Sequence, residues 1–120
     1  MQTISVPLQN QSYPIWIENG LINTLPELLK PLNQGQRWVL FSQEEIFNHY
    51  GATLVNSLKN DGFSVESIIY PDGEEAKSLT VLEDIYPQLV EMGCDRSATF
   101  LALGGGVVGD ITGYIAATFM

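Results

Sequence analysis

The chain has 120 residues, 45% of them apolar and 16% charged, which is the composition of a single ordinary globular domain and excludes a disordered or repetitive chain. Fourteen acidic residues against five basic ones give a net charge of −9, so no basic surface is available to bind nucleic acid. Cys94 is the only cysteine, which excludes an internal disulfide, and the N-terminus lacks the pattern of a secretory signal. We therefore expect a cytoplasmic protein.

The opening residues predict a β-hairpin followed by a helix. Residues 3–8 and 13–17 have the composition of strands and are separated by a polar stretch. Residues 21–32 carry leucines at helical spacing, with Thr24 as a possible N-cap and Pro26 in the first turn, where proline is tolerated.

The middle of the sequence alternates strands with helices. Residues 37–42 form a short apolar run, which is typical of a strand buried on both faces of a parallel sheet. A helix follows at once, with Ser42 and Glu45 as a capping box, and Gly62 marks its end. Gly51 weakens the middle of this helix by about 1 kcal/mol relative to alanine.

The same alternation continues to the end of the chain. Residues 63–70 predict a strand, residues 79–90 a helix, and residues 99–103 a last strand, which a glycine turn and a final helix follow. Pro87 conflicts with its helix, because it removes one hydrogen bond and clashes with the preceding turn at a cost of about 3 kcal/mol. We expect a kink or a break just before it.

The last segment could be mistaken for a membrane span, because residues 99–120 are mostly apolar. Asp110 would then lie in the middle of the bilayer, and the glycines of this segment suit a turn and a closely packed helix better than a lipid-facing one. We expect a buried strand and helix, and no membrane contact. The whole order predicts an α/β fold: a Rossmann-like parallel sheet preceded by an N-terminal β-hairpin, with ligands at the carboxyl ends of the strands.

A glycine-rich stretch stands between the last predicted strand and the last helix. Gly104-Gly105-Gly106-Val107-Val108-Gly109 fits the pattern G-x-G-x-x-G. Glycines lack Cβ atoms and let a pyrophosphate approach the backbone, where the first N–H groups of a helix and its dipole hold the anion. Two observations weigh against this interpretation: glycines here could serve only close packing, and the pattern lies late in the chain with Asp110 directly after it.

A second candidate segment follows the strand of residues 63–70. Pro71-Asp72-Gly73-Glu74-Glu75-Ala76-Lys77 is a turn that carries carboxylates and one lysine. Carboxylates suit the hydroxyl groups of a ribose, and the lysine can pair with them or reach a phosphate. A solvated turn that starts a helix would have the same composition.

Taken together, the two segments resemble the 3-dehydroquinate synthase family, in which Pro-Asp-Gly-Glu-x-x-Lys precedes Ala-Leu-Gly-Gly-Gly-Val-Val-Gly-Asp. The resemblance extends to Tyr13-Pro14-Ile15 in the hairpin and to Gly113-Tyr114-Ile115-Ala116-Ala117-Thr118. It implies an enzyme of the shikimate pathway that binds NAD and cyclises a sugar phosphate, 3-deoxy-arabino-heptulosonate 7-phosphate, to 3-dehydroquinate with release of phosphate. It also implies a divalent metal, zinc or cobalt, beside the substrate.

The resemblance assigns nucleotide contacts to both segments. They are Asp72, Gly73, Glu74, Glu75, Ala76 and Lys77 in the first, and Gly105, Gly106, Val107, Val108, Gly109 and Asp110 in the second. No catalytic residue is expected among the residues of this chain. The family commonly has Asp or Asn where this chain has Gln43, and a small polar residue near Glu45, so the contribution of that loop stays open.

The metal site is expected elsewhere. His49 is the only histidine, and the family holds its metal with a glutamate and two histidines of a later helical domain. The chain also stops in an apolar helix without a terminating signal. We therefore expect residues 1–120 to be an incomplete N-terminal NAD-binding domain, truncated before the C-terminal helical metal-binding domain, inactive alone and part of a homodimer when whole.

Three alternatives stay open at this point. The first is another sugar-phosphate cyclase, such as a deoxy-inosose or epi-valiolone synthase, which shares the scaffold and NAD. The second is an iron-dependent alcohol or glycerol dehydrogenase. The third is a non-catalytic binding or assembly module whose glycines serve only packing.

Overall fold

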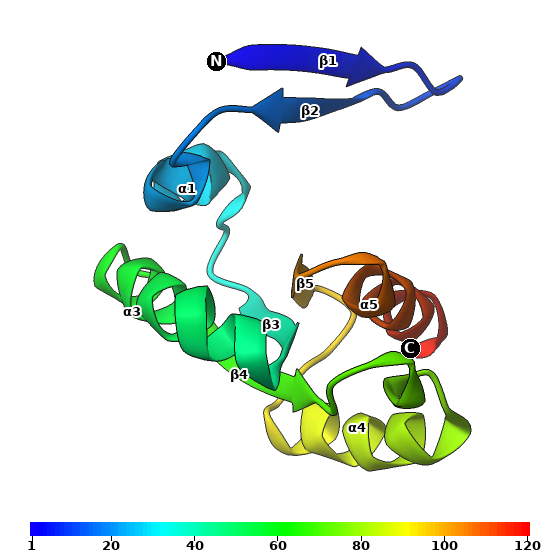
Figure 1. Ribbon diagram of the computed structural model, residues 1–120. Helices are drawn as coiled ribbons and strands as arrows, with labels where there is room; N and C mark the ends of the chain where they lie inside the picture. The colour runs from blue at the N-terminus through cyan, green and yellow to red at the C-terminus, as the bar shows by residue number, and fades with distance from the viewer. The chain divides into compact units, whose positions relative to one another are not determined.

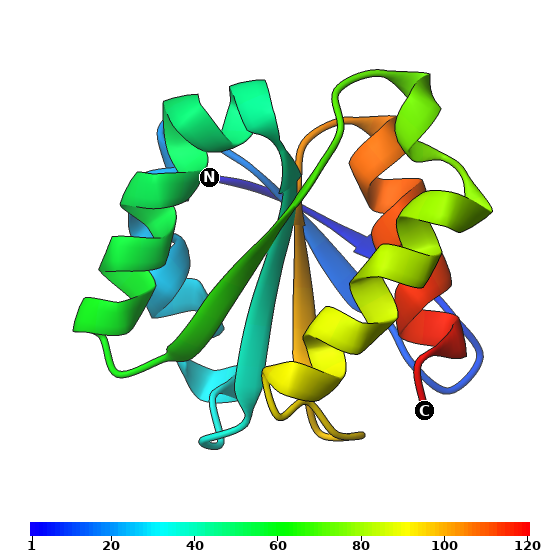
Figure 2. The same ribbon diagram turned by 90° about the horizontal axis from the view of Figure 1, so that it is seen from below.

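The computed structural model describes residues 1–120, which divide into two compact units, residues 1–31 and residues 32–120. The first unit holds a β-hairpin and a helix (Figure 1). The second is a three-stranded parallel sheet with helices on both faces (Figure 2). None of the helices combines the length and the apolar character that crossing a bilayer requires.

The predicted hairpin is confirmed in the first unit. Strand β1 (Gln2–Val6) pairs antiparallel with strand β2 (Tyr13–Ile17). The first strand was expected to reach residue 8 but ends earlier, because Pro7 has no N–H group with which to extend the ladder.

The helix of the first unit, α1 (Leu21–Leu29), begins earlier than predicted. Gly20, with a φ of 74°, turns the chain into the helix. The N-cap expected at Thr24 is therefore wrong, and the hydroxyl of that threonine instead donates to the carbonyl of the first helical residue at 3.1 Å. Pro26 lies inside the helix and not in its first turn. A 3-10 turn, η1 (Lys30–Leu32), follows.

The parallel sheet of the second unit confirms the predicted fold class. Its strand order is β4 (Ser64–Tyr70), β3 (Arg37–Gln43), β5 (Thr99–Leu103), so the first of these strands in sequence lies in the centre. After β3 the chain adds β4 at one edge of the sheet, and it then crosses over to add β5 at the other edge. The order of the strands thus reverses between β3 and β5, and parallel α/β sheets bind ligands at such a switch point.

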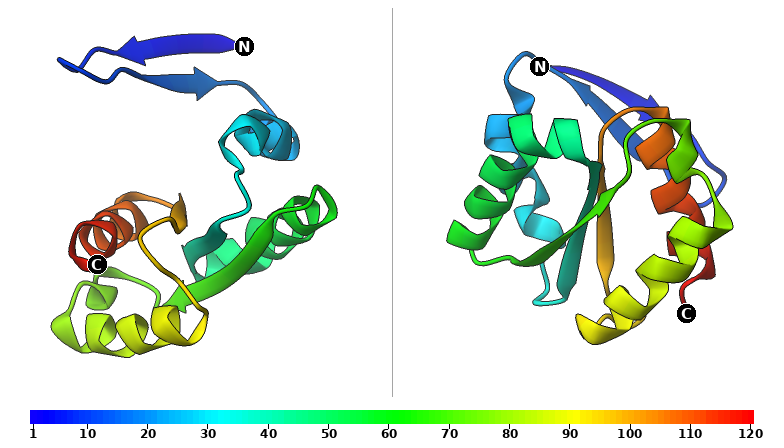
Figure 3. Two further views of the ribbon diagram at one scale, coloured as in Figure 1. Left: turned by 180° about the vertical axis from the view of Figure 1, so that it is seen from behind. Right: turned by 60° about the horizontal axis from the view of Figure 1, so that its bottom comes forward.

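Helices cover the two faces of this sheet. Helix α3 (Ala52–Asn60), preceded by the short helix α2 (Glu44–Ile46) and the π-helical turn η2 (Phe47–Gly51), lies on one face. Helices α4 (Leu79–Glu91) and α5 (Gly106–Thr118) lie side by side on the other (Figure 2, Figure 3). The core under these two helices consists of Val39, Phe41, Ile68, Tyr70, Ala76, Ile85, Leu89, Cys94, Val108, Ile111 and Ile115.

The capping box expected of Ser42 and Glu45 is wrong. Ser42 still belongs to β3 and is fully buried, and its hydroxyl donates to the carbonyl of Leu103 at 2.7 Å. The N-cap of α2 is Gln43, whose side chain makes no capping bond. A buried hydroxyl has to find a partner, and the neighbouring strand supplies one.

The helical segment that follows β3 contains a π-helical turn, η2, which sequence analysis did not predict. Gly51 is buried in the π-helical turn, where an added Cβ would fall into the ring of Phe47. The ring of Phe47 lies so close to the backbone that only glycine fits at this position. Helix propensity predicted that Gly51 weakens the helix, but it could not predict this packing requirement.

The break considered at Pro87 does not occur, because α4 runs unbroken from Leu79 to Glu91. The proline lies on the exposed side of the helix, whereas Ile85 and Leu89 on the inner side are buried in the core. Burial of the inner face outweighs the cost of about 3 kcal/mol that proline carries inside a helix.

We predict that replacing Leu89 by alanine lowers the free energy of unfolding by about 2 to 5 kcal/mol, because it removes buried surface and leaves a cavity. Val90→Ala is the matched control on the same helix, since this side chain is 61% exposed. It should change stability by less than about 0.5 kcal/mol. Chemical denaturation of the full-length protein measures both, and equal effects would show that α4 does not pack as described.

Candidate functional site

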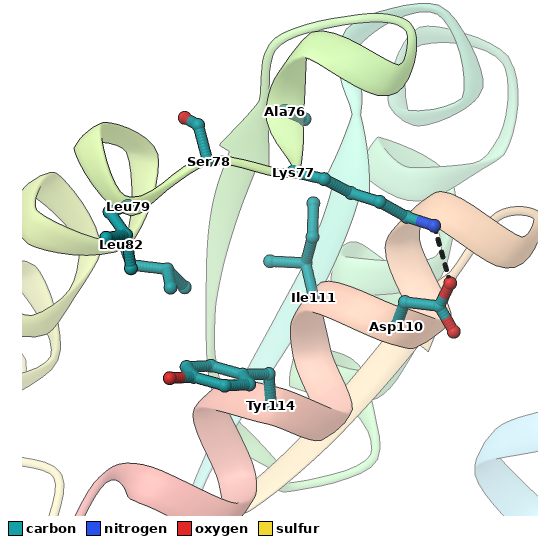
Figure 4. A pocket seen from close by; sticks show the side chains of 8 residues that line it. All are labelled: Ala76, Lys77, Ser78, Leu79, Leu82, Asp110, Ile111 and Tyr114. Carbon is teal, nitrogen blue, oxygen red and sulfur yellow. Dashed lines mark hydrogen bonds and ion pairs between the residues drawn. The ribbon is translucent and has the colours of Figure 1, made fainter.

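Both sequence motifs lie at the carboxyl edge of the sheet, on either side of the end of β3. The 3-10 turn η3 (Glu74–Ala76) follows β4, and the glycine turn follows β5. The structure brings the motifs together directly, because Lys77 Nζ lies 2.7 Å from Asp110 Oδ2 (Figure 4). The two segments that the sequence singled out separately thus form one site.

The glycines of the second motif have two different roles. At Gly104 the φ is 152°, and an added Cβ would lie 2.8 Å from Cγ2 of Val108. This glycine is needed for packing. A Cβ at Gly105, Gly106 or Gly109 would meet no protein atom within 4 Å. Packing therefore explains the first glycine only, and the others leave open space beside the backbone.

The start of α5 has no side-chain cap. The helix begins at Gly106, and its N-cap residue, Gly105, makes no side-chain hydrogen bond. The N–H groups of the first helical turn, including that of the half-buried Val107, have no carbonyl partner within the helix. Amides at a helix start, together with the helix dipole, are suited to bind an anion where a ligand can reach them. Gly106 is exposed, whereas Val108 is fully buried in the core.

Lys77 joins the two motifs by charge. Its Nζ lies 2.7 Å from Asp110 Oδ2 and 3.5 Å from Glu74 Oε2. The hydrogen bond that Lys77 donates to Asp110 is the main cause that raises the pKa of Lys77 above its ordinary value. The lysine therefore stays protonated at neutral pH, and this stabilisation is lost only as the pH rises through the raised pKa. Two carboxylates already compensate its charge.

The end of β3 contacts the first motif through Gln43, whose role the sequence left open. Its Nε2 donates to the carbonyl oxygens of Pro71 at 2.9 Å and of Gly73 at 3.1 Å. Both N–H groups of the amide are thus directed at the turn before η3. Neither Asp72 nor Glu75 makes a side-chain hydrogen bond or ion pair, and the side chain of Ala76 is buried in the core.

A buried hydrogen bond that the sequence did not predict connects β4 to α5 beneath the site. Tyr70, the last residue of β4, places its hydroxyl 3.2 Å from Oγ1 of Thr112 on α5. Burial raises the pKa of Tyr70, and the hydrogen bond to Thr112 opposes this only in part. The phenol thus stays neutral and serves as a brace. No local pattern marks such a pair, because its two members are 42 residues apart.

A pocket of about 340 Å³ lies between the start of α4 and the neighbouring side of α5 (Figure 4). It is lined by Ala76, Lys77, Ser78, Leu79, Leu82, Asp110, Ile111 and Tyr114. Its walls are apolar except near the ion pair of Lys77 with Asp110, and its volume falls in the lower range of small-molecule sites. No group of three or more His, Cys, Asp and Glu side chains is arranged to hold a metal ion.

The parallel sheet, its switch point and the hairpin define the chain as a Rossmann-like α/β protein. Residues 67–120 match the family model described as 3-dehydroquinate synthase N-terminal. The chain is 44% identical over 118 residues to the 3-dehydroquinate synthase of Picosynechococcus, and 42% identical over 120 residues to that of Pelotomaculum thermopropionicum. The chain is thus similar to 3-dehydroquinate synthases over nearly its whole length. They cover 98% and 100% of this chain but only 32% of each relative, so the chain spans about a third of their length.

Solved structures confirm the fold at lower sequence identity. A crystal structure of 2-deoxy-scyllo-inosose synthase complexed with carbaglucose-6-phosphate, NAD⁺ and Co²⁺ superposes with a TM-score of 0.76 at 20% identity. It covers 99% of this chain, and the chain covers 32% of it. A second structure of a 2-deoxy-scyllo-inosose synthase gives a TM-score of 0.75 at 19% identity.

We predict that Asp110→Asn lowers the pKa of the Lys77 side chain toward its ordinary value, because the variant removes the nearest opposite charge. Titration of lysine side chains by NMR in the full-length protein measures this pKa. Glu75→Gln is the control, since this neighbouring carboxylate makes no ion pair with Lys77 and its removal should leave the titration almost unchanged. An unchanged pKa in the Asp110 variant would contradict the ion pair.

Proposed function

We propose that this chain is the N-terminal NAD-binding part of a longer enzyme, a 3-dehydroquinate synthase. The enzyme would convert 3-deoxy-arabino-heptulosonate 7-phosphate to 3-dehydroquinate and release phosphate. One observation carries the proposal: the glycine turn of a chain homologous to these synthases is open to a ligand and adjoins the Lys77 segment.

The open glycines fit a dinucleotide. A Cβ at Gly105, Gly106 or Gly109 would occupy space that no protein atom fills, and that space lies beside the uncapped amides of α5. A pyrophosphate placed there would be held by main-chain N–H groups and the helix dipole. This way of binding suits a chain of net charge −9 whose nearest lysine is already paired with two carboxylates.

The first motif would hold the remainder of the nucleotide. Glu74 and Asp72 are exposed carboxylates that can accept hydrogen bonds from ribose hydroxyl groups. Lys77 lies close enough to Glu74 to orient it. The contact proposed for Ala76 has to come from its main chain, because its side chain is buried.

The chain's part in the reaction is then to bind and orient the cofactor. NAD, when bound, supplies a reversible oxidation of a substrate hydroxyl group. The proposal places the divalent metal, zinc or cobalt, and most contacts to the sugar phosphate on residues outside this chain, since no metal-binding group of side chains occurs here. It further includes a homodimer and a cytoplasmic location for the whole enzyme.

We predict that Gly106→Val and Glu74→Ala each weaken NAD binding by the full-length protein by roughly tenfold or more. The valine would fill the space left for phosphate, and the alanine would remove an acceptor for a ribose hydroxyl. Isothermal calorimetry measures both affinities.

The control for these two variants is Gly113→Val. It lies on the same helix, and its Cβ also meets no protein atom, but it is away from the helix start. Its affinity for NAD should equal that of the wild type. Unchanged affinity in both Gly106→Val and Glu74→Ala would remove the basis for the assignment of the site.

We also predict that the full-length protein, supplied with NAD and a divalent metal, releases phosphate from 3-deoxy-arabino-heptulosonate 7-phosphate without net formation of NADH. A colorimetric assay measures the released phosphate, and absorbance measures any NADH that forms. Turnover of a different sugar phosphate instead would identify another sugar-phosphate cyclase, and accumulation of NADH with a simple alcohol would identify a dehydrogenase.

A further inference from the structure

The last two residues of β3 lie between the two motifs. Because β3 is the central strand, its end is flanked by the turn after β4 on one side and the glycine turn after β5 on the other. Successive side chains of a strand point to opposite faces of its sheet. Ser42 and Gln43 therefore leave the same strand end in opposite directions, and each makes a hydrogen bond to a different motif.

Ser42 holds the peptide that enters the glycine turn. Its buried hydroxyl donates to the carbonyl of Leu103 at 2.7 Å, and this carbonyl belongs to the peptide bond with Gly104. The φ of Gly104 is 152°, a conformation that only glycine adopts readily. Fixing the preceding peptide plane sets the direction in which the chain reaches the open positions at Gly105 and Gly106.

Gln43 holds the turn that enters the first motif. Its Nε2 donates to the carbonyls of Pro71 and Gly73, and the second of these belongs to the peptide bond with Glu74. The φ of Gly73 is 81°, so this turn also passes through a conformation that favours glycine. Because both amide hydrogens of Gln43 are donated to the turn, only its oxygen is left for a ligand.

We propose that Ser42 and Gln43 are positioning residues that together form a clamp at the end of β3, which holds both halves of the nucleotide site at the spacing that NAD requires. The clamp rests on the proposed function, because the ligand is the one assigned there. Neither residue needs to contact the cofactor: each acts through the carbonyl of the peptide bond that opens its motif.

Calorimetry of the full-length protein with NAD tests the clamp, at a temperature well below the unfolding midpoint of every variant. Ser42→Ala and Gln43→Met should each weaken NAD binding about tenfold. Gln88→Met is the matched control. Its side-chain amide also donates to a backbone carbonyl, that of Asp84 at 2.9 Å, but on the outer part of α4.

Hydrogen exchange of the NAD-free protein supplies the readout that does not depend on the cofactor. Gln43→Met should speed amide exchange in residues 72–77 and not in residues 104–108, and Ser42→Ala should do the reverse. Loss of NAD affinity together with this separate response of the two loops supports the clamp. Faster exchange with unchanged affinity overturns it. Failure of the wild type to bind NAD would overturn the proposed function and the clamp's role in it, and loop-specific exchange would then show only that Ser42 and Gln43 each order one loop.

Discussion

The proposed nucleotide site depends on the main-chain amides at the start of α5, which no side chain caps. The chain has nine more negative than positive charges, so a phosphate group cannot rely on nearby free cations. Gly104 lets the helix turn back onto the sheet against Val108, while the positions after it keep space beside the backbone. The same short stretch thus combines tight packing on its inner side with an accessible outer side, which a residue with a Cβ could not do at the first position.

The loops around these amides are held by pairwise links between elements that are far apart in sequence. Lys77 and Asp110 connect the turn after β4 to α5, and Tyr70 and Thr112 connect the same two regions below the surface. The ion pair has a second effect, because it compensates a carboxylate near the helix start that would otherwise repel an anion. Links of this kind restrict the loops, which would lower the entropy that a ligand has to overcome on binding.

The similarity to 3-dehydroquinate synthases covers nearly the whole of this chain. The chain spans about a third of the length of these relatives. The same fold recurs in 2-deoxy-scyllo-inosose synthase at 20% identity. A fold that persists at such low identity depends on the pattern of buried residues and on the turn chemistry at the strand ends more than on particular surface residues.

The sequence by itself determined the order of strands and helices, the parallel sheet and the two motifs. Periodic apolar residues and glycines act through local geometry, and both can be recognised without knowledge of the fold. Only the tertiary structure decided which partners the polar side chains find. Ser42 looked like a helix cap but bonds to Leu103, Gln43 holds a turn of another strand, and Pro87 passes through an unbroken helix because the core holds its inner face. These outcomes depend on which strands become neighbours and on which helix face is buried. The spacing of residues along the chain does not determine either of them.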